Sequence, residues 1–428
     1  MLAAIVLGSI SLKTQLSEKL AKIVLWPVAA LGAVTLLATP SNVAAAAQWW
    51  VQVVLLAAFV VTLAKLQVSS SESQAGRSDF RTIGPIPSTK PLEDLTRSTK
   101  HKARNAIASI VFWFVLSLLP CVIAVAHQVL TQNVWGWSWL GVAAQDPSSL
   151  GVSVVQTGGL RWLRAYGIFP HPNILGAWSA LGVLCATHLY LTAKRQAERA
   201  AWLIVQTAFV TCLFYSFSRA AWLAAAMGLV AMAFSLARTL PKDEWRRLKV
   251  EKRLAIFVVP LLAAACLTVA NGDLVWTRAT VQASRTERIS LDVRAQSLRD
   301  GLAVYAAYPF FGTGPSNYLP ALATAKNLTT SPAPLEPPHL VWLLALAETG
   351  TVGFAAIWFA LASVGVLLRK SRRTADARLW SLALAAAAAW TVALLFDHYA
   401  WSLWSGQTLT ALVVFLVLAA TPTNEKAA

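Results

Sequence analysis

Charged residues are scarce in this sequence of 428 residues. Asp, Glu, Lys and Arg make up 13% of the chain and hydrophobic residues 57%, whereas a soluble globular protein has about 25% charged residues. This scarcity excludes a large soluble domain, because too few polar side chains are present to cover its surface. At about 20 apolar residues per spanning helix, the length suffices for about ten to twelve transmembrane helices and one or two sizeable loops. We therefore expect an all-α polytopic membrane protein.

Cysteine is also rare, and its placement excludes two kinds of site. The four cysteines, at positions 121, 185, 212 and 266, all lie inside apolar runs. Their spacing fits neither a disulfide framework nor a metal site, so we expect them to be small core residues.

Several nucleotide- and metal-binding motifs are absent. The sequence holds no Walker A motif, no dinucleotide glycine fingerprint and no His-Glu-x-x-His, and no Asp-x-Asp pair lies in the segments assigned below to the outer face. Tyr308–Gly314 contains a lone Gly-x-Gly, which is far more often a turn than a phosphate cradle. ATP hydrolysis, nicotinamide chemistry and a carboxylate-bound metal lack support, and we expect neither a cofactor nor a metal.

Basic residues are in excess, and their positions predict the topology. The 36 Lys and Arg against 19 Asp and Glu give a net charge of +17, which in a soluble protein would suggest a nucleic-acid partner. Here 27 of the 36 lie between apolar runs, at 13–22, 65–105, 194–200, 238–253, 369–378 and the short C-terminal tail. Under the positive-inside rule these segments are cytoplasmic, and nucleic acid is not expected.

Ten apolar runs are long enough to cross a membrane, and residues 1–12 are an eleventh candidate. The runs lie near 22–39, 44–64, 106–127, 173–193, 201–216, 220–237, 254–270, 340–368, 379–396 and 403–420. We expect residues 1–420 to form a single bundle with a cytoplasmic linker at 66–105. Segments 128–172 and 271–339 are too polar and too rich in Gly and Pro to span, so we expect ordered outer loops, the second with a helix near 286–305.

Nine basic residues remain on the outer side. They are Arg161, Arg164, Arg219, Arg278, Arg285, Arg288, Arg294, Arg299 and Lys326. Cations near lipid are costly unless an anion pairs with them, so this set predicts an anionic ligand. Arg219 is the sharpest case, because it lies in a very short turn between two apolar runs, where its planar guanidinium suits phosphate oxygens. The alternative is an interfacial arginine that snorkels beside Trp222.

Four of the six histidines, His127, His171, His339 and His398, lie at the outer ends of spans. His339 stands where an imidazole can take a proton near the membrane surface, although a structural histidine at the helix start is the alternative. For His171, which lies between two prolines, the alternative to a functional role is a histidine that packs in a rigid turn. For His398 the alternative is a hydrogen-bonded helix cap. Glu348 lies about half a turn out of phase with His339 on a straight helix, so we expect it to be structural and bonded to a neighbouring helix.

Five segments between about 170 and 399 form an ordered set. They are Pro170–Asn173, Ser218–Leu223, Arg294 placed fifteen residues before Pro309–Gly314, His339 with Ala347–Gly350, and Phe396–Tyr399. The set resembles the bacterial O-antigen ligase and polymerase family, membrane glycosyltransferases that act on undecaprenyl-diphosphate-linked sugars. Leu340 departs from the pattern, because the family usually has a polar residue there, and the N-terminal third carries no resemblance.

The resemblance implies a GT-C-like bundle with a large helical periplasmic loop, in the bacterial inner membrane, with its active site facing the periplasm or the cell exterior. It also implies that Arg219 and Arg294 hold the donor diphosphate and that His339 activates the acceptor hydroxyl. The implied partners are an undecaprenyl-diphosphate-linked glycan donor, a lipid A-core or glycan acceptor, and membrane lipids. Other arginines and histidines in the segments assigned to the outer face are possible substrate-binding residues. They are Arg161, Arg164, His171, Arg288 and His398.

Arginines aimed at a departing diphosphate stabilise its charge as a metal does in other glycosyltransferases, so we expect metal-independent, inverting transfer. Within this class, a repeat-unit polysaccharide polymerase and a protein oligosaccharyltransferase are the alternatives to a lipid A-core ligase. A flippase for lipid-linked sugars is the alternative of another class. A transporter should carry charges near the bilayer midplane and show two related halves, whereas here the charges gather at one surface and no repeat is visible.

Overall fold

A computed structural model describes the fold for most of the chain. The described residues are 29, 31–35, 37–38, 41–72, 107–136, 138, 142–240, 250–280, 285–327, 335–372 and 376–421. The expected span at 1–12, most of the run at 22–39 and most of the linker at 66–105 lie outside these residues.

Six of the described helices are long and apolar enough to cross a membrane. They are Ile107–Thr131, which ends in α5 (Leu119–Thr131), α6 (Pro172–Thr192), α7 (Gln196–Tyr215), α8 (Arg219–Thr239), α14 (Val341–Ser371) and α15 (Ala377–Leu394). A seventh span forms if α10 (Val250–Ala270) and α11 (Gly272–Ala279), bent by 99°, are counted together. Shorter apolar helices, Val43–Ala58 within α3 (Val43–Glu72) and α17 (Trp404–Ala419), match two further predicted runs. The protein is an all-α polytopic membrane protein.

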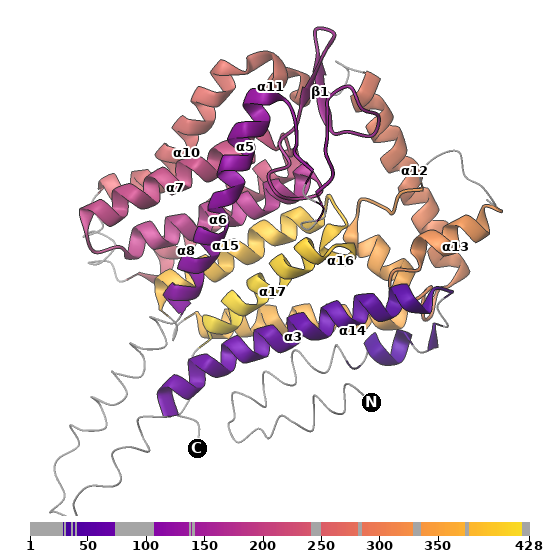
Figure 1. The fold of residues 1–428 in the computed structure, drawn as a ribbon. Coiled ribbons are helices and arrows are strands. Elements are labelled where there is room, and N and C mark those ends of the chain that lie inside the picture. The colour runs from indigo at the N-terminus through magenta and orange to yellow at the C-terminus, as the bar shows by residue number, and fades with distance from the viewer. Residues whose placement is uncertain are drawn as a thin grey trace, which may run out of the picture.

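The centre of the bundle is α6, which packs against α7, α8 and α15 (Figure 1). Close packing of α8 on its neighbours depends on small residues. A Cβ at Gly228 would come within 2.7 Å of Leu184 on α6 and 3.1 Å of Ala389 on α15. In a membrane such close approach replaces the hydrophobic effect as the source of helix association. Three of the four cysteines are buried as expected, whereas Cys266 is exposed.

Segment 128–172, expected to be an outer loop, contains a β-hairpin that the sequence did not lead us to expect. Strand β1 (Val154–Thr157) pairs antiparallel with β2 (Leu160–Leu163). The connecting residues Gly158 and Gly159 both have positive φ angles, 54° and 81°, which a two-residue hairpin turn requires and which glycine adopts at no steric cost. The hairpin projects beyond the end of α5 (Figure 1).

Segment 271–339, also expected to be an outer loop, contains the expected helix, α12 (Arg285–Ala307), and a short α13 (Tyr318–Ala325). Helix α14 follows, and it is interrupted at Gly350, whose φ and ψ are 63° and −174°. Residues 309–314 fill this interruption. The amides of Thr313 and Gly314 donate to the carbonyls of Ala347 and Glu348, at 3.1 and 2.9 Å. The amide of Thr351 in turn donates to the carbonyl of Pro309 at 2.8 Å. The loop therefore satisfies backbone groups that the broken helix leaves open.

The Glu348 side chain fastens the same loop. Its carboxylate accepts hydrogen bonds from the amides of Ser316 and Tyr318, at 2.8 and 3.1 Å, and from Trp401 Nε1 at 2.7 Å. Trp401 belongs to α16 (Tyr399–Ser402), the short helix between α15 and α17. The structural role expected for Glu348 is confirmed, and Gly312 and Gly314 form turns with positive φ angles of 70° and 85°.

Candidate active site

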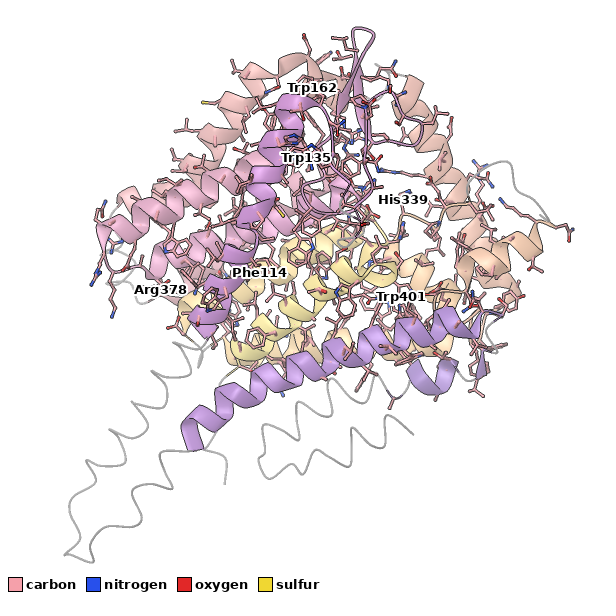
Figure 2. The ribbon with its side chains drawn as sticks, viewed as in Figure 1. Phe114, Trp135, Trp162, His339, Arg378 and Trp401 are labelled. Carbon is pink, nitrogen blue, oxygen red and sulfur yellow. The ribbon has the colours of Figure 1, made fainter. Side chains whose placement is uncertain are left out.

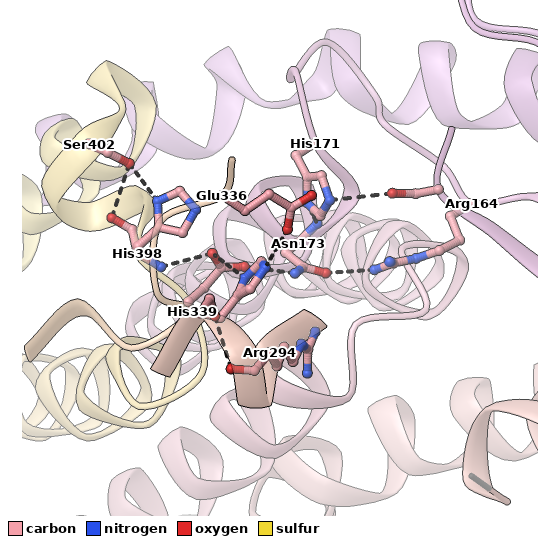
Figure 3. Close-up of polar contacts among 11 residues, drawn as sticks. Arg164, His171, Asn173, Arg294, Glu336, His339, His398 and Ser402 are labelled. Carbon is pink, nitrogen blue, oxygen red and sulfur yellow. Dashed lines mark hydrogen bonds and ion pairs between the residues drawn. The ribbon is translucent and has the colours of Figure 1, made fainter. Parts of the chain in front are cut away.

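His339 lies two residues before α14, between two carboxylates (Figure 3). Its Nε2 is 3.4 Å from Glu336 Oε2, and its Nδ1 is 3.7 Å from Asp397 Oδ1. Burial of the ring and the charge of Arg294 disfavour the imidazolium, but the two carboxylates outweigh them and raise the pKa of His339 to about 9. At neutral pH the ring is therefore mostly in its positively charged imidazolium form in the unliganded protein.

Asp397 lies at the corner between α15 and α16, and it is 7% exposed. Its Oδ2 accepts a hydrogen bond from Asn173 Nδ2 at 2.7 Å, and its Oδ1 accepts one from the backbone amide of His398 at 2.8 Å. Burial alone would raise the pKa of this carboxyl, but contact with His339 and the nearby His398 and His171 hold the pKa well below its usual range. Asp397 is consequently ionised and directed at His339.

Helix α6 begins at this site, and His171 is its N-cap. His171 Nδ1 accepts from the amide of Asn173 at 3.1 Å, while its Nε2 lies 3.3 Å from Ser153 Oγ. Burial and the charge of Arg164 lower the pKa of His171 to about 4, so the ring is neutral. These contacts fit a rigid-turn role for His171, and substrate binding by His171 stays a prediction.

Arg164 follows strand β2 and is 7% exposed. Its Nε donates to the carbonyl of Ser216 at 2.8 Å, and its Nη2 donates to Asn173 Oδ1 at 2.6 Å. The guanidinium of Arg164 is therefore buried against the Ser216 carbonyl and the Asn173 side chain, and it holds these two groups in place.

Arg219 is the first residue of α8, after the N-cap Ser218. The preceding turn has an unusual backbone, because Phe217 has a φ of 46° and a fully buried side chain. Buried Arg278 stabilises this turn by donating from Nε and Nη2 to the Phe217 carbonyl, at 3.2 and 2.9 Å. Arg219 Nη1 donates to the carbonyl of Arg278 at 3.0 Å. The Ser218-Arg219 turn is thus held in place by its neighbours.

Arg294 projects from α12 and lies close to His339 in Figure 3. Its Nε is buried and has no hydrogen-bond partner among the described residues. A buried guanidinium N–H normally has an acceptor, so this group is suited to an anionic ligand.

Three other predicted residues have different surroundings. Arg161 is exposed on the hairpin and donates to the Ser149 carbonyl at 3.2 Å. Arg288 lies in the first turns of α12, where side chains are outside the described part of the structure. The His398 ring lies 5.5 Å from that of His339, and its Nδ1 is 2.7 Å from Ser402 Oγ. Burial is the main cause that lowers the pKa of His398.

The contacts also bring in residues that the sequence did not single out as site candidates, namely Asn173, Asp397 and Glu336, and they give Arg278, one of the nine basic residues, a place beside the Phe217 carbonyl. Asn173 and Asp397 lie inside two of the recognised segments, next to predicted histidines. A polar residue beside a candidate histidine at the outer end of a span was the signal that could have identified them.

The site also holds a group of potential metal ligands. His339, Asp397 and His398 offer ligand atoms within 4.8 Å of one another. Two imidazoles and a carboxylate suit a divalent transition metal, but such an ion would have to displace the proton that His339 carries. The expected metal independence stays a prediction.

Comparison with known families adds an independent observation. Residues 203–358 match the family model described as O-antigen ligase. Over these residues, about a third of the chain, the match supports the resemblance to the O-antigen ligase family. The matched segment contains Arg219, Arg294 and His339, while Asn173 and Asp397 lie outside it. Comparison with curated proteins gave no match.

The O-antigen ligase match supports, in general terms, a membrane glycosyltransferase of the ligase and polymerase type. In general terms, the family acts with a lipid-linked glycan donor and with a lipid A-core or glycan acceptor. The structure places its three predicted key residues on α8, on α12 and immediately before α14.

Proposed function

We propose that the protein transfers a glycan from undecaprenyl diphosphate to a hydroxyl of lipid A-core, with inversion and without a metal. The observation that carries this proposal is the juxtaposition of His339 with Arg294. An imidazole backed by a buried carboxylate lies beside a guanidinium whose buried Nε has no partner among the described residues. One group can accept a proton, and the other can bind the oxygens of a diphosphate.

In the proposed reaction, the acceptor hydroxyl attacks the anomeric carbon from the face opposite the diphosphate. The hydroxyl proton passes to neutral His339, a new C–O bond forms, and the bond to the diphosphate oxygen breaks with its electron pair. Arg219 and Arg294 stabilise the charge that develops on this oxygen. Asp397 orients the ring and stabilises the imidazolium that forms.

The resting protonation of His339 requires a prior step. With a pKa of about 9, roughly one molecule in a hundred has a neutral ring at pH 7. The base is therefore available only after the proton has left, and the reaction should speed up with rising pH.

The experiment is a transfer assay with purified protein and a polyprenyl-diphosphate-linked glycan, in excess EDTA. Three acceptors are offered separately: lipid A-core, a second lipid-linked glycan and a pilin-like protein. Product on lipid A-core supports the ligase proposal, whereas product only on one of the other two identifies a polymerase or an oligosaccharyltransferase. Loss of activity with EDTA and rescue by one metal would refute metal independence.

Variants test the assigned roles in the same assay. Arg219→Lys and Arg294→Lys keep the charge but lose the planar fork, so we expect turnover to fall at least about tenfold. His339→Ala should lower the single-turnover rate by about 10²-fold or more while donor affinity is retained. The control is Arg238→Lys, because Arg238 contacts Phe234 at the opposite end of α8 and should behave as wild type. A wild-type rate in His339→Ala would remove His339 as the base. If instead both arginine variants bound donor and reacted normally, the arginines would be headgroup anchors, whereas donor binding without transfer by the wild type would favour a flippase.

A further inference from the structure

Two parts of the site lie on elements that are far apart in the sequence. Arg219 belongs to the turn between α7 and α8, whereas the partners of His339 come from the segment before α14 and from the corner at Asp397. Their relative position matters, because the diphosphate and the acceptor hydroxyl must meet at one anomeric carbon.

Buried Arg164 contacts the first of these parts directly. Its Nε donates to the carbonyl of Ser216, three residues before Arg219. That carbonyl and the neighbouring Phe217 carbonyl, bound by Arg278, define the path of the turn. A change at Arg164 would therefore alter the position from which α8 and Arg219 begin.

Asn173 connects Arg164 to the second part. Its Oδ1 accepts from Arg164 Nη2 at 2.6 Å, and its Nδ2 donates to Asp397 Oδ2 at 2.7 Å. An arginine can only donate and a carboxylate can only accept, so a single orientation of the amide satisfies both. Alanine offers neither group, and aspartate offers an acceptor to Arg164 but no donor to Asp397. The position requires an amide of this length.

Asp397 completes the connection. One oxygen is bound by Asn173, and the other accepts from the His398 amide and faces His339 Nδ1 at 3.7 Å. Because both oxygens are engaged, the carboxylate cannot rotate away from the imidazole without breaking a hydrogen bond.

We propose that Arg164 and Asn173 are positioning residues that fix the turn carrying Arg219 relative to the Asp397 and His339 pair. This inference rests on the proposed function, whose binding and proton-accepting groups it connects. The series Ser216, Arg164, Asn173, Asp397 and His339, termed here the relay, orients these groups and moves no proton, since arginine stays protonated in proteins.

Asn173→Ala and Arg164→Gln test the relay. Asn173→Ala removes the hydrogen bonds to Arg164 and Asp397 but leaves the bond from Arg164 to the Ser216 carbonyl. We therefore expect the single-turnover rate to fall at least about tenfold, with donor affinity within about threefold of wild type. Arg164→Gln also releases the turn, so both rate and donor affinity should fall. The double variant should be no slower than the slower single variant, because two cuts in one connection do not add. Asn173→Asp should not restore the rate.

Asn317→Ala is the matched control. Asn317 is also buried and donates through Nδ2 to two carbonyls, those of Asn42 and Pro315, at 3.2 and 2.9 Å. Its loss should lower thermal stability, as any lost buried amide would, while the turnover rate per folded molecule stays near wild type.

A second measurement does not depend on transfer. The pKa of His339, followed by NMR of protein labelled at histidine, should fall by at least about half a unit in Asn173→Ala, because Asp397 no longer faces the ring firmly. It should not move in Asn317→Ala. An unchanged pKa in Asn173→Ala, or rate losses that multiply in the double variant, would overturn the relay. Absence of transfer by the wild type would instead refute the proposed function, and the pKa comparison would still decide the relay.

Discussion

At the scale of single residues, the protonation of His339 decides whether the proposed base is available. Among the described residues, the charged or titratable side chains near its ring include Glu336, Asp397, Arg294, His398 and His171. The two carboxylates prevail over burial and over Arg294, and they raise the pKa of His339 to about 9. A group with a raised pKa is charged below that value, so it becomes a base only as the pH increases.

The first prediction concerns the pH dependence of kcat/KM. If neutral His339 is the base, kcat/KM should rise about tenfold per pH unit from pH 7 and level off near pH 9. Glu336→Gln removes one of the carboxylates that raise the pKa, so the rise should shift to lower pH. The exposed Asp292 on α12 offers a matched control, and Asp292→Asn should leave the profile in place. A flat profile between pH 6 and 9 would contradict the assignment of His339.

The sequence predicted individual site residues better than it predicted their partners. Topology and motif each point to single positions, so they can nominate Arg219, Arg294 and His339 as candidates. The role of Asn173 could not, because it depends on a hydrogen bond to Asp397 across 224 positions of sequence. Likewise, Arg164 is an outer cation by position, and only the fold shows that its guanidinium is buried against Ser216 and Asn173.

At the scale of elements, α14 shows where hydrophobic pattern fails as a predictor. The apolar run 340–368 indicates one continuous span, yet the helix is interrupted at Gly350. A Cβ on Gly350 would lie 2.3 Å from the backbone of Phe310, and one on Gly312 would lie 2.3 Å from the backbone of Glu348. These two glycines allow the loop to enter the helix, a contact between backbones that apolar periodicity does not report.

The second prediction is that Gly350→Ala destabilises the protein strongly. Its positive φ costs an alanine about 1–3 kcal/mol, and the clash with Phe310 adds to this, so melting temperature and yield of folded protein should both fall. Gly365→Ala on the same helix is the control, because a Cβ there meets nothing within 4 Å. That change should be neutral or slightly stabilising. Equal melting temperatures for the two variants would show that the interruption of α14 is not required.

At the scale of the whole molecule, the sequence predicted the fold class and the helix in segment 271–339 but not the hairpin. Composition alone determines that the chain must be a helical bundle in a membrane. The hairpin depends on eight strand residues and on the Gly158-Gly159 turn. This is a local signal that the lengths of apolar runs do not report. Seven of the ten predicted runs coincide with described helices or a bent pair that can span, two more coincide with the shorter apolar helices, and the run at 22–39 lies mostly outside the described residues.

The last prediction concerns the direction of the bundle in the membrane. His171 caps the N-terminus of α6 at the site, and Gln196 begins α7 just after the C-terminus of α6. Because α6 has 21 residues, these two positions lie about 30 Å apart. Figure 2 likewise shows His339 and Arg378 toward opposite ends of the bundle. Since basic residues gather beside Gln196, the site should face outward.

Single cysteines test this direction in a variant that carries Cys266→Ser, because the other three cysteines are buried. Asn327→Cys lies after α13 on the side of the site, and Gln196→Cys lies on the basic side. Both positions are exposed, so access to the reagent depends only on the side of the membrane. A membrane-impermeant maleimide added to spheroplasts should label Asn327→Cys at once and Gln196→Cys only after permeabilisation. Labelling of both without permeabilisation would show that the predicted topology is wrong, and labelling of Gln196→Cys alone would place the site in the cytoplasm, where an undecaprenyl-linked donor facing the periplasm could not reach it.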